Sequence, residues 1–426
     1  MEGKSIYMRM EKLFPICRSI TGEGFRKSLN MLQDDCNVKI NVQFIPSGTK
    51  VFDWTVPKEW NIKEGYIEDS SGKRIVDFSN NNLHIVGYSL PVDRYVTLKE
   101  LKSILHTQPA MPDAIPYVTS YYQEQVGFCI SQNQYDNLKD DIYHIYINST
   151  LSDGFLTYGE IYIPGESNEE IFFSTYLCHP SMANNELSGP CLAIELANRL
   201  SKSSHRYSYR IVIVPETIGS IAYLSKNLSV LKSNVIAGFN LSCLGDDAAY
   251  TYVESRYGNT LADKVVKSCL SEIDGEVRHY RYLKRGSDER QYNMPGIDLP
   301  VVGLYRSKSN EYKEYHTSAD NMDFVKPKAL QESYDFICKC IEVLEANKKY
   351  VNVVKCEPQL GKYGLYPKTS ERGGAKSTGA WKYLDVLAYA DGTNDIMDIS
   401  AITGIKVSEV INLIDDLSRN HLIKSN

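Results

Sequence analysis

Several features that would assign a chain to a familiar class are missing from this sequence. It has no apolar run long enough to cross a bilayer, and its amino-terminal residues contain no signal-peptide core. None of its ten cysteines forms a CxxC pair, and most lie inside apolar runs, which is typical of free buried thiols in a reducing compartment. Basic residues are not in excess either, because the formal net charge is −6. We therefore expect a cytoplasmic protein with no nucleic-acid or membrane partner.

The sequence does contain enough apolar residues for more than one core. At 426 residues and 42% apolar composition, two or three domains are expected. In residues 37–106, short alternating runs separated by Pro, Gly and Asn turns indicate a small β-rich insert. Helix patterns in residues 1–36 and alternating strand and helix patterns in 107–352 predict one α/β domain with a mostly parallel sheet. Within it, Tyr143 to Ile147 and Gly159 to Ile163 are expected to pair as edge strands around a Ser-Asp-Gly loop.

Residues 357–426 have a different character. A linker rich in Gly, Lys, Ser and Pro, from about Glu357 to Thr378, precedes three short helix patterns and an extended end, which is the order of a winged-helix module. From Trp381 on, four basic residues stand against seven acidic ones. Contacts with DNA phosphates need the opposite charge. We therefore interpret the tail as a module that contacts a protein partner.

The stretch from Ile171 to Leu200 is the part of the α/β domain best suited to chemistry. A continuous apolar run as far as Leu177 predicts a buried strand, and leucines spaced four residues apart predict the helix that follows. The polar loop between strand and helix holds His179 and Glu186. Because ligands bind beyond the carboxyl ends of the strands in open α/β sheets, this loop is a candidate site.

A second histidine lies on another polar loop. His316 is in YHTSADN, after a second apolar strand. The imidazoles of His179 and His316 and the carboxylate of Glu186 suit one Zn²⁺ ion with one position open to water. The plainer interpretation of His179 is a hydrogen-bonded histidine at a strand end, and the spacing of the three residues does not by itself fix a ligand set.

Two further carboxylates follow strand patterns at the same edge. Glu216, in IVIVPETIG, fits either a general base beside a metal-activated water or a charge at a helix amino terminus. Asp288, in RGSDERQY, fits the orientation of a metal-bound histidine, the binding of a substrate amine, or a turn or cap. The sequence leaves these alternatives open.

Other reactive or charged residues fit plainer roles. Arg18 and Arg306 each suit a substrate carboxylate or, more simply, a structural ion pair. Cys178 and His179 are adjacent, so on a strand their side chains would point to opposite faces. This argues against a thiol–imidazole pair.

Eight segments between about Lys12 and Val351 carry a family resemblance. They are FPICRSITGEG, GTKVFDWTVPKEWNI, PYVTSYY, GFCIS, CHPSMANNELSGP, VPETIGSIAYL, GSDERQY and EYHTSADN. In these segments the chain resembles the aminopeptidase-like proteins encoded in bacterial polysaccharide-biosynthesis loci. Those proteins are distant relatives of the zinc-dependent exopeptidases, which include the two-zinc leucyl aminopeptidases and glutaminyl cyclase. The resemblance implies a three-layer phosphorylase/hydrolase-like α/β sandwich with a small β insert and a C-terminal winged-helix module.

The resemblance also assigns roles to single residues. His179 and His316 match the first and last histidine ligands of the two-zinc enzymes, and Glu216 matches their general base. The other three ligand positions, those of a bridging Asp, a Glu and a second Asp, fall on Asn185, Thr217 and Ser242. A neutral amide cannot offset the repulsion between two cations. The resemblance therefore implies one zinc ion, held by His179, Glu186 and His316, with Glu186 turned inward.

Two functions remain open from the sequence. The first is a zinc-dependent hydrolase of the aminopeptidase or carboxypeptidase type, in which Glu216 deprotonates the attacking water and Asp288 positions a short peptide or an acyl-amide on a sugar precursor. The second is a ligand-binding or scaffold protein of polysaccharide biosynthesis on a degraded peptidase fold, which the loss of three ligand positions favours. The acidic tail disfavours a ligand-responsive transcription factor. A homo-oligomer is left open.

Overall fold

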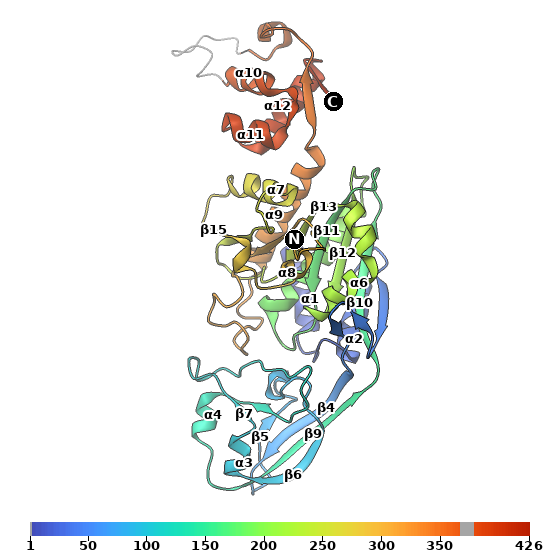
Figure 1. Ribbon diagram of the computed structural model, residues 1–426. Coiled ribbons are helices and arrows are strands. Elements are labelled where there is room, and N and C mark those ends of the chain that lie inside the picture. The colour runs from blue at the N-terminus through green and yellow to red at the C-terminus, as the bar shows by residue number, and fades with distance from the viewer. Residues whose placement is uncertain (1, 367–378) are drawn as a thin grey trace. The chain divides into compact units, whose positions relative to one another are not determined.

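The computed structural model describes residues 2–366 and 379–426, and the chain divides into two compact units (Figure 1). The first comprises Met1–Ala262 and Val277–Tyr334, and the second comprises Asp263–Glu276 and Asp335–Asn426. The linker expected at residues 357–378 lies partly outside the described residues. In the two described ranges, no helix combines the length and the apolarity that a membrane span requires.

An eight-stranded mixed sheet is the centre of the first unit. Its strand order is β1-β10-β12-β11-β13-β16-β14-β15. The strands are β1 (Asn41–Pro46), β10 (Phe155–Ile163), β11 (Glu170–Tyr176), β12 (Ser208–Val214), β13 (Val235–Leu241), β14 (Tyr250–Val253), β15 (Val277–Tyr280) and β16 (Val301–Tyr305). The neighbours β12, β11, β13 and β16 run parallel. The carboxyl ends of these four strands therefore share one edge of the sheet.

Helices cover both faces of the sheet because its central strands are apolar throughout. Every residue of β11 is buried, as a strand packed on two sides requires. On one face, Phe172 packs with α6 (Ile218–Asn234). On the other face, the first turn of α5 (Ser188–Leu200) lies directly against Thr175, and α1 (Glu2–Leu13) packs on α5. The three-layer α/β architecture expected from the sequence is confirmed.

A second, four-stranded sheet forms the β-rich part of the same unit. Its order is β5-β4-β9-β6, with β4 (Glu59–Glu68), β5 (Arg74–Asp77), β6 (Val92–Thr97) and β9 (Ile142–Ser152). β9 lies beyond the range 37–106 expected for the insert, and β1, within that range, belongs to the large sheet. The expected pairing of residues 143–147 with 159–163 is wrong, since β9 pairs with β4 and β6. Its apolar residues Tyr143, Ile145 and Ile147 are buried in the core of the smaller sheet.

The second unit contains the carboxyl-terminal module. Three helices, α10 (Ala380–Tyr389), α11 (Ile396–Thr403) and α12 (Val407–Arg419), accompany a three-stranded sheet of order β18-β17-β19. Its strands are β17 (Lys349–Asn352), β18 (Asp391–Asp395) and β19 (Ile423–Ser425). This is the arrangement expected of a winged-helix module. β17 lies within residues 107–352, which were expected to belong to the α/β domain.

The remaining elements are mostly short. The helices are α2 (Glu23–Asp34), α3 (Leu98–Lys102), α4 (Gln132–Asp136), α7 (Leu261–Leu270), α8 (Glu289–Tyr292) and α9 (Pro327–Ala346). The short strands are β2 (Lys50–Val51), β3 (Trp54–Thr55), β7 (Leu105–His106) and β8 (Phe128–Cys129). Single turns are η1 (Asn82–His84), η2 (Ala183–Leu187), η3 (Tyr282–Lys284) and η4 (Leu360–Tyr363).

Candidate active site

Three loops at the carboxyl edge of the large sheet bring the candidate residues together. His179 follows β11, Glu216 follows β12, and His316 is on the long loop after β16. Nε2 of His179 lies 3.9 Å from a carboxylate oxygen of Glu216. The ring centroids of His179 and His316 are 5.4 Å apart, and the ring centroid of Tyr117 is 5.1 Å from each of them. The structure therefore places the three residues that the sequence selected in one cluster.

Glu216 is in an environment that favours its protonated form. Burial raises the pKa of its carboxyl group, although the positive charges of His179 and Arg290 act in the opposite direction. The hydroxyl of Ser287 donates a hydrogen bond to Oε1 of Glu216 at 3.0 Å. The side chain is still 23% exposed, so it is open to a ligand. A carboxylate with a raised pKa is suited to proton transfer near neutral pH.

The backbone at the ends of these loops is unusual. Thr217, next to Glu216, has a φ of 65°, and His316 has a φ of 55°. Side chains other than glycine rarely adopt this left-handed region, and such residues concentrate at functional sites. The surrounding structure, and not the backbone preference of these residues alone, therefore holds Glu216 and His316 in place.

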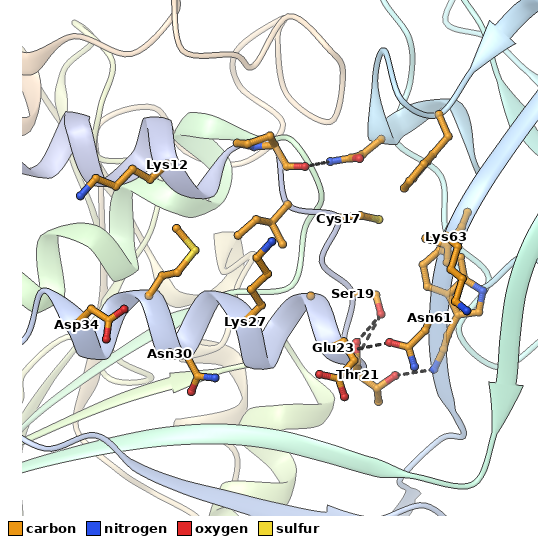
Figure 2. Close-up of a pocket in the computed structure, with 18 residues that line it drawn as sticks. Lys12, Cys17, Ser19, Thr21, Glu23, Lys27, Asn30, Asp34, Asn61 and Lys63 are labelled. Atoms are coloured by element: carbon orange, nitrogen blue, oxygen red, sulfur yellow. Dashed lines mark hydrogen bonds between the residues drawn. The ribbon is translucent and has the colours of Figure 1, made fainter.

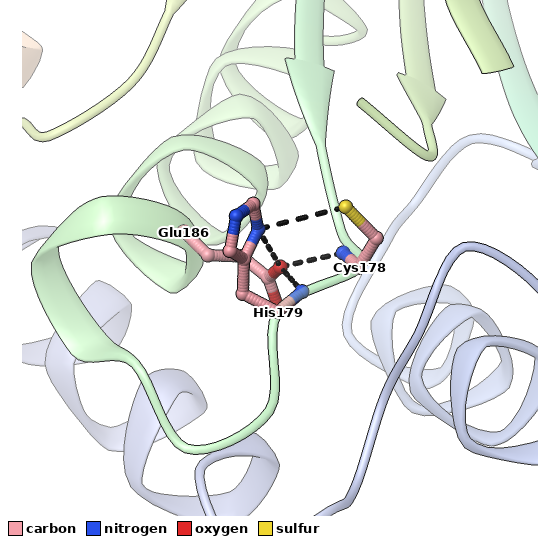
Figure 3. Close-up of side chains that lie close together, drawn as sticks. All are labelled: Cys178, His179 and Glu186. Carbon is pink, nitrogen blue, oxygen red and sulfur yellow. Dashed lines mark hydrogen bonds and ion pairs between the residues drawn. The ribbon is translucent and has the colours of Figure 1, made fainter. Parts of the chain in front are cut away.

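Glu186 lies near His179 (Figure 3), beside Nδ1 of its ring, whereas Glu216 lies nearer to Nε2. Its Oε2 accepts hydrogen bonds from the backbone N–H groups of Cys178, at 2.5 Å, and His179, and it lies 3.2 Å from Nδ1 of His179. Its Oε1 accepts a hydrogen bond from Nε of Arg18 at 2.6 Å. With these donors in place, Glu186 is arranged to orient His179.

Cys178 is closer to His179 than the sequence suggested. Its Sγ lies 3.5 Å from Nδ1 of His179, and Cys178, His179 and Glu186 offer ligand atoms within 4.8 Å of one another. The expectation that the two adjacent side chains point apart is wrong, because β11 ends at Tyr176 and alternation does not continue beyond it. Burial raises the pKa of the Cys178 thiol to about 11. A raised pKa disfavours the thiolate form that a nucleophile needs.

Asp288 binds to the backbone that carries Glu216. Its Oδ1 accepts hydrogen bonds from the backbone N–H of Thr217 and the hydroxyl of Ser220, both at 2.8 Å. Burial, and then the charge of Glu216, raise the pKa of Asp288 to about 7. These contacts place Asp288 at the first turn of α6, where it holds the turn after Glu216.

The two arginines fill structural roles. Arg18 is fully buried and, besides Glu186, donates to the carbonyl oxygens of Leu13 and His179. Arg306 pairs with Glu332 at 3.0 Å and donates to a backbone carbonyl. Of the two sequence interpretations, the structural ion pair is the one that both geometries fit.

Neutral side chains stand at Asn185, Thr217 and Ser242, the three positions where the family resemblance implied charged metal ligands. The hydroxyl of Tyr176 donates to Oδ1 of Asn185 at 2.7 Å and lies 2.5 Å from Oγ of Ser242. The hydroxyl of Thr217 accepts a hydrogen bond from Arg290 at 2.5 Å. Sequence analysis did not select Tyr176, because it lies in an apolar run like any buried strand residue.

Tyr117 was also missed as a site residue. It packs against both histidine rings, and its hydroxyl lies 2.8 Å from that of Tyr121. Burial raises the pKa of both phenols well above the usual value, so they stay neutral. The segment PYVTSYY, which holds both tyrosines and carries part of the family resemblance, was the available signal.

The chemistry of the cluster fits a single cation. Nε2 of His316 is buried and has no hydrogen-bond partner among the described residues. Burial and the neighbouring His179 lower the pKa of His316 to about 3, so its imidazole is neutral, which is the form that binds metal. Burial opposes a charge on His179, but Cys178 and Glu186 raise its pKa above the usual value, so a metal bound there would displace a proton from this imidazole. Two imidazoles beside the Glu216 carboxylate suit one zinc ion better than two, because the bridging carboxylate is absent.

Comparisons with known proteins agree with the two-part organisation. A family described as a domain of unknown function, DUF4910, matches residues 7–347, and a winged helix-turn-helix family matches residues 348–425. A Clostridium acetobutylicum protein, named as a candidate polysaccharide biosynthesis protein with an aminopeptidase-like domain, is 45% identical over 423 residues. The match covers 99% of this chain and 96% of the relative.

Solved structures show the same fold. The crystal structure of a candidate peptidase from C. acetobutylicum superposes with a TM-score of 0.94 at 44% identity, covering 100% of this chain and 96% of that chain. A zinc aminopeptidase from Bacillus subtilis gives a TM-score of 0.57 at 12% identity, with 80% and 94% covered. A peptidase M28 precursor from Shewanella amazonensis gives 0.55 at 13% identity, with 83% and 95% covered. At this low identity, the last two matches show the fold alone.

Proposed function

The chain belongs to the DUF4910 family and carries an aminopeptidase-like fold, and from this premise we propose that it is a metal-dependent hydrolase that cleaves an amide bond. One observation carries the proposal: His179, Glu216 and His316, from three separate loops, meet at the carboxyl edge of the parallel strands. Such an edge is where α/β proteins bind ligands.

His179 and His316 would hold one zinc ion, with Glu216 beside it as the general base. The ion would supply Lewis-acid polarisation of the scissile carbonyl. Glu216 would take a proton from the attacking water and pass it to the leaving amine. Glu186 would act behind His179, fixing the orientation of the imidazole through Nδ1, and Asp288 would hold the turn that aims Glu216. These last two roles replace the metal-ligand and substrate roles that the sequence suggested.

The substrate class that we propose is supported by the name of the Clostridium relative. That protein is named for polysaccharide biosynthesis, and we propose the same process for this chain. An acyl-amide on a sugar precursor would then be the substrate, with a short peptide as the alternative.

Metal-dependent amide hydrolysis tests this proposal. The protein is purified without chelator, its zinc content is measured, and amine release from acyl-amide and aminoacyl-amide libraries is followed with and without added Zn²⁺. Glu216→Gln is expected to lower the rate by about 100-fold or more, while Glu11→Gln, on the exposed face of α1, should leave it unchanged. Activity that persists without metal or in Glu216→Gln would overturn the mechanism.

A second function is supported by the network around Tyr176. Its neutral hydrogen bonds to Asn185 and Ser242 take the place of charged ligands. A protein that binds a ligand at this edge of the sheet without hydrolysing it would need no metal. Ligand binding that is unaffected by zinc removal, together with no hydrolysis by the wild-type protein or by Glu216→Gln, would favour this alternative.

We also propose that the winged-helix module contacts a protein rather than DNA. Two of the three acidic side chains of its last helix, α12, have basic partners within the second unit: Glu409 binds Lys382 at 2.6 Å, and Asp416 binds Arg419 at 2.9 Å. The single arginine of α12 is therefore engaged, which leaves little positive charge on this helix for phosphate.

A further inference from the structure

Arg290 lies beside the candidate active site and takes no part in the proposed mechanism. It is on α8, two residues after Asp288, and its Nη2 donates a hydrogen bond to the hydroxyl oxygen of Thr217 at 2.5 Å. Thr217 directly follows Glu216, whose Oε1 accepts a hydrogen bond from Ser287 of the same segment as Arg290. The guanidinium group therefore contacts the residue next to the proposed general base.

Arg290 is also close to the loop of His316. The ring of Tyr315 stacks on that of His316, with 3.9 Å between the ring centroids. Burial raises the pKa of Tyr315, and the positive charge of Arg290 opposes this increase. The same charge opposes the increase that burial causes in the pKa of Glu216. Arg290 therefore lies where the loops of Glu216 and His316 come together.

The short helix that carries Arg290 is held firmly in place. The buried carboxylate of Glu289 accepts a hydrogen bond from the hydroxyl of Tyr305 on β16 at 3.0 Å. The buried hydroxyl of Tyr292 lies 2.7 Å from that of Ser174 on β11. A side chain that starts from a fixed backbone loses less freedom when it binds a ligand. The fold therefore positions the Arg290 side chain in advance.

No carboxylate of the described residues forms an ion pair with Arg290, although its side chain is half-buried. Arg18, Arg210 and Arg306, by contrast, each lie 3.0 Å or less from a carboxylate oxygen. The Nε of Arg290 is buried and has no hydrogen-bond partner among the described residues. A partly desolvated charge without a partner is costly, and the planar guanidinium matches a carboxylate in a bidentate contact. These features suit an anionic partner that a ligand supplies.

The cavity of about 910 Å³ lined by α1, α2 and β4 offers no comparable anion site (Figure 2). Lys12, Lys27 and Lys63 are exposed and lie apart from one another along its wall. The hydroxyls of Ser19 and Thr21 are already hydrogen-bonded within the protein. The half-buried guanidinium at the candidate active site is therefore the better defined of the two.

We propose that Arg290 binds a carboxylate of the substrate, and that the substrate is an amide with a carboxylate close to the scissile bond. The proposal rests on the amide hydrolysis proposed for Glu216 and the two histidines. Because Arg290 contacts the residue next to Glu216, an anion on its remaining N–H groups lies near the carbon under attack. N-acylated amino acids and N-acylated sugar acids carry such a carboxylate, whereas a neutral N-acyl sugar does not.

Isothermal titration calorimetry on the full chain tests the proposal with two pairs of probes, in each of which one member carries a carboxylate. N-acetylglycine is compared with N-acetylglycinamide, and N-acetylmuramic acid with N-acetylglucosamine, so that the pairs distinguish a peptide-like from a sugar-like substrate. In at least one pair the acid is expected to bind about tenfold or more tightly than its neutral counterpart. Arg290→Gln should remove this preference. Arg290→Lys should restore only part of it, because an ammonium group lacks the planar fork.

The ratio of the two affinities separates ligand binding from a structural role, since a distorted site would weaken both members of a pair alike. Arg94→Gln makes the same charge change at an exposed position of β6 and should keep the wild-type preference. Where a probe is hydrolysed, KM takes the place of Kd.

Three results would each overturn the role of Arg290: no binding of either acid, equal binding of acid and neutral probe, or a preference that survives in folded Arg290→Gln. Acid-selective binding without hydrolysis would keep Arg290 as the anion-binding residue and count against the hydrolase. Hydrolysis without acid selectivity would keep the hydrolase and reject the role of Arg290.

Discussion

The side chains of Arg18 and Glu186 form an ion pair with no exposed surface. Their charged groups are 2.6 Å apart, and both side chains are 0% exposed. Such a pair stabilises a fold only while both partners are present, because either charge alone would be desolvated without compensation. The pair therefore ties the amino-terminal segment to the loop that carries His179.

Arg18→Met is expected to lower the free energy of unfolding by about 3–5 kcal/mol, because it removes the arginine whose charge compensates the buried Glu186 carboxylate. Urea denaturation followed by circular dichroism measures this loss. Adding Glu186→Gln to the same chain should restore part of it, since the charge is then removed as well. A loss under about 1 kcal/mol for Arg18→Met would mean that the backbone N–H donors alone satisfy Glu186.

Asp288 makes the stability of the fold depend on pH. Its pKa is raised from 3.8 to about 7, so between these values the folded chain binds a proton that the unfolded chain has released. The free energy of unfolding must then fall as pH rises from about 4 to about 7, and this contribution is fully present only below the unfolded pKa. Asp288→Asn removes it, so urea denaturation at several pH values should show a smaller fall. An unchanged pH profile would contradict the raised pKa.

At the scale of elements, sequence patterns identified the loops that carry the candidate site. They did not identify every strand pairing or every long-range side-chain contact. His179, Glu216 and His316 could be found because each follows an apolar strand, and parallel strands end at one edge. The pairing of β9 could not be found, because the alternation of Tyr143, Ile145 and Ile147 fits a strand of either sheet. The role of Glu186 depends on Arg18, which is 168 residues away, and no local pattern links the two.

The first turn of α5 packs so closely on the sheet that only glycine fits at residue 189. A Cβ there would lie 2.3 Å from the hydroxyl oxygen of Thr175 and 2.6 Å from the carbonyl oxygen of Leu241. Gly189→Ala is therefore expected to destabilise the fold by about 1–3 kcal/mol, as overpacking does, and to move the loop of His179 with the helix. Thermal unfolding measures the effect. Gly361→Ala, where a Cβ meets nothing within 4 Å, is the matched control and should change stability little.

At the scale of the whole chain, the boundary between the two family matches differs from the boundary between the two compact units. The two family matches meet at residues 347 and 348, yet the second compact unit also includes Asp263–Glu276. The reason lies in long-range contacts within that unit. Lys264 binds Asp395 and Asp398, both at 2.6 Å, and the hydroxyl of Ser408 donates to Glu272 at 2.8 Å.

The charge of the winged-helix module predicts that it does not bind duplex DNA, which its fold alone would not predict. Affinity for duplex DNA comes mainly from lysine and arginine contacts to phosphate and falls steeply with salt. In α12, Glu409, Asp415 and Asp416 outnumber Arg419, which is itself paired with Asp416. The full chain is therefore expected to leave the fluorescence anisotropy of a labelled duplex unchanged at physiological salt. At low salt it should raise the anisotropy only slightly. Replacing the three acids of α12 with lysine should create salt-dependent binding, which confirms that charge, not shape, excludes DNA. Tight binding by the wild-type chain would contradict the assignment of the module to protein contacts.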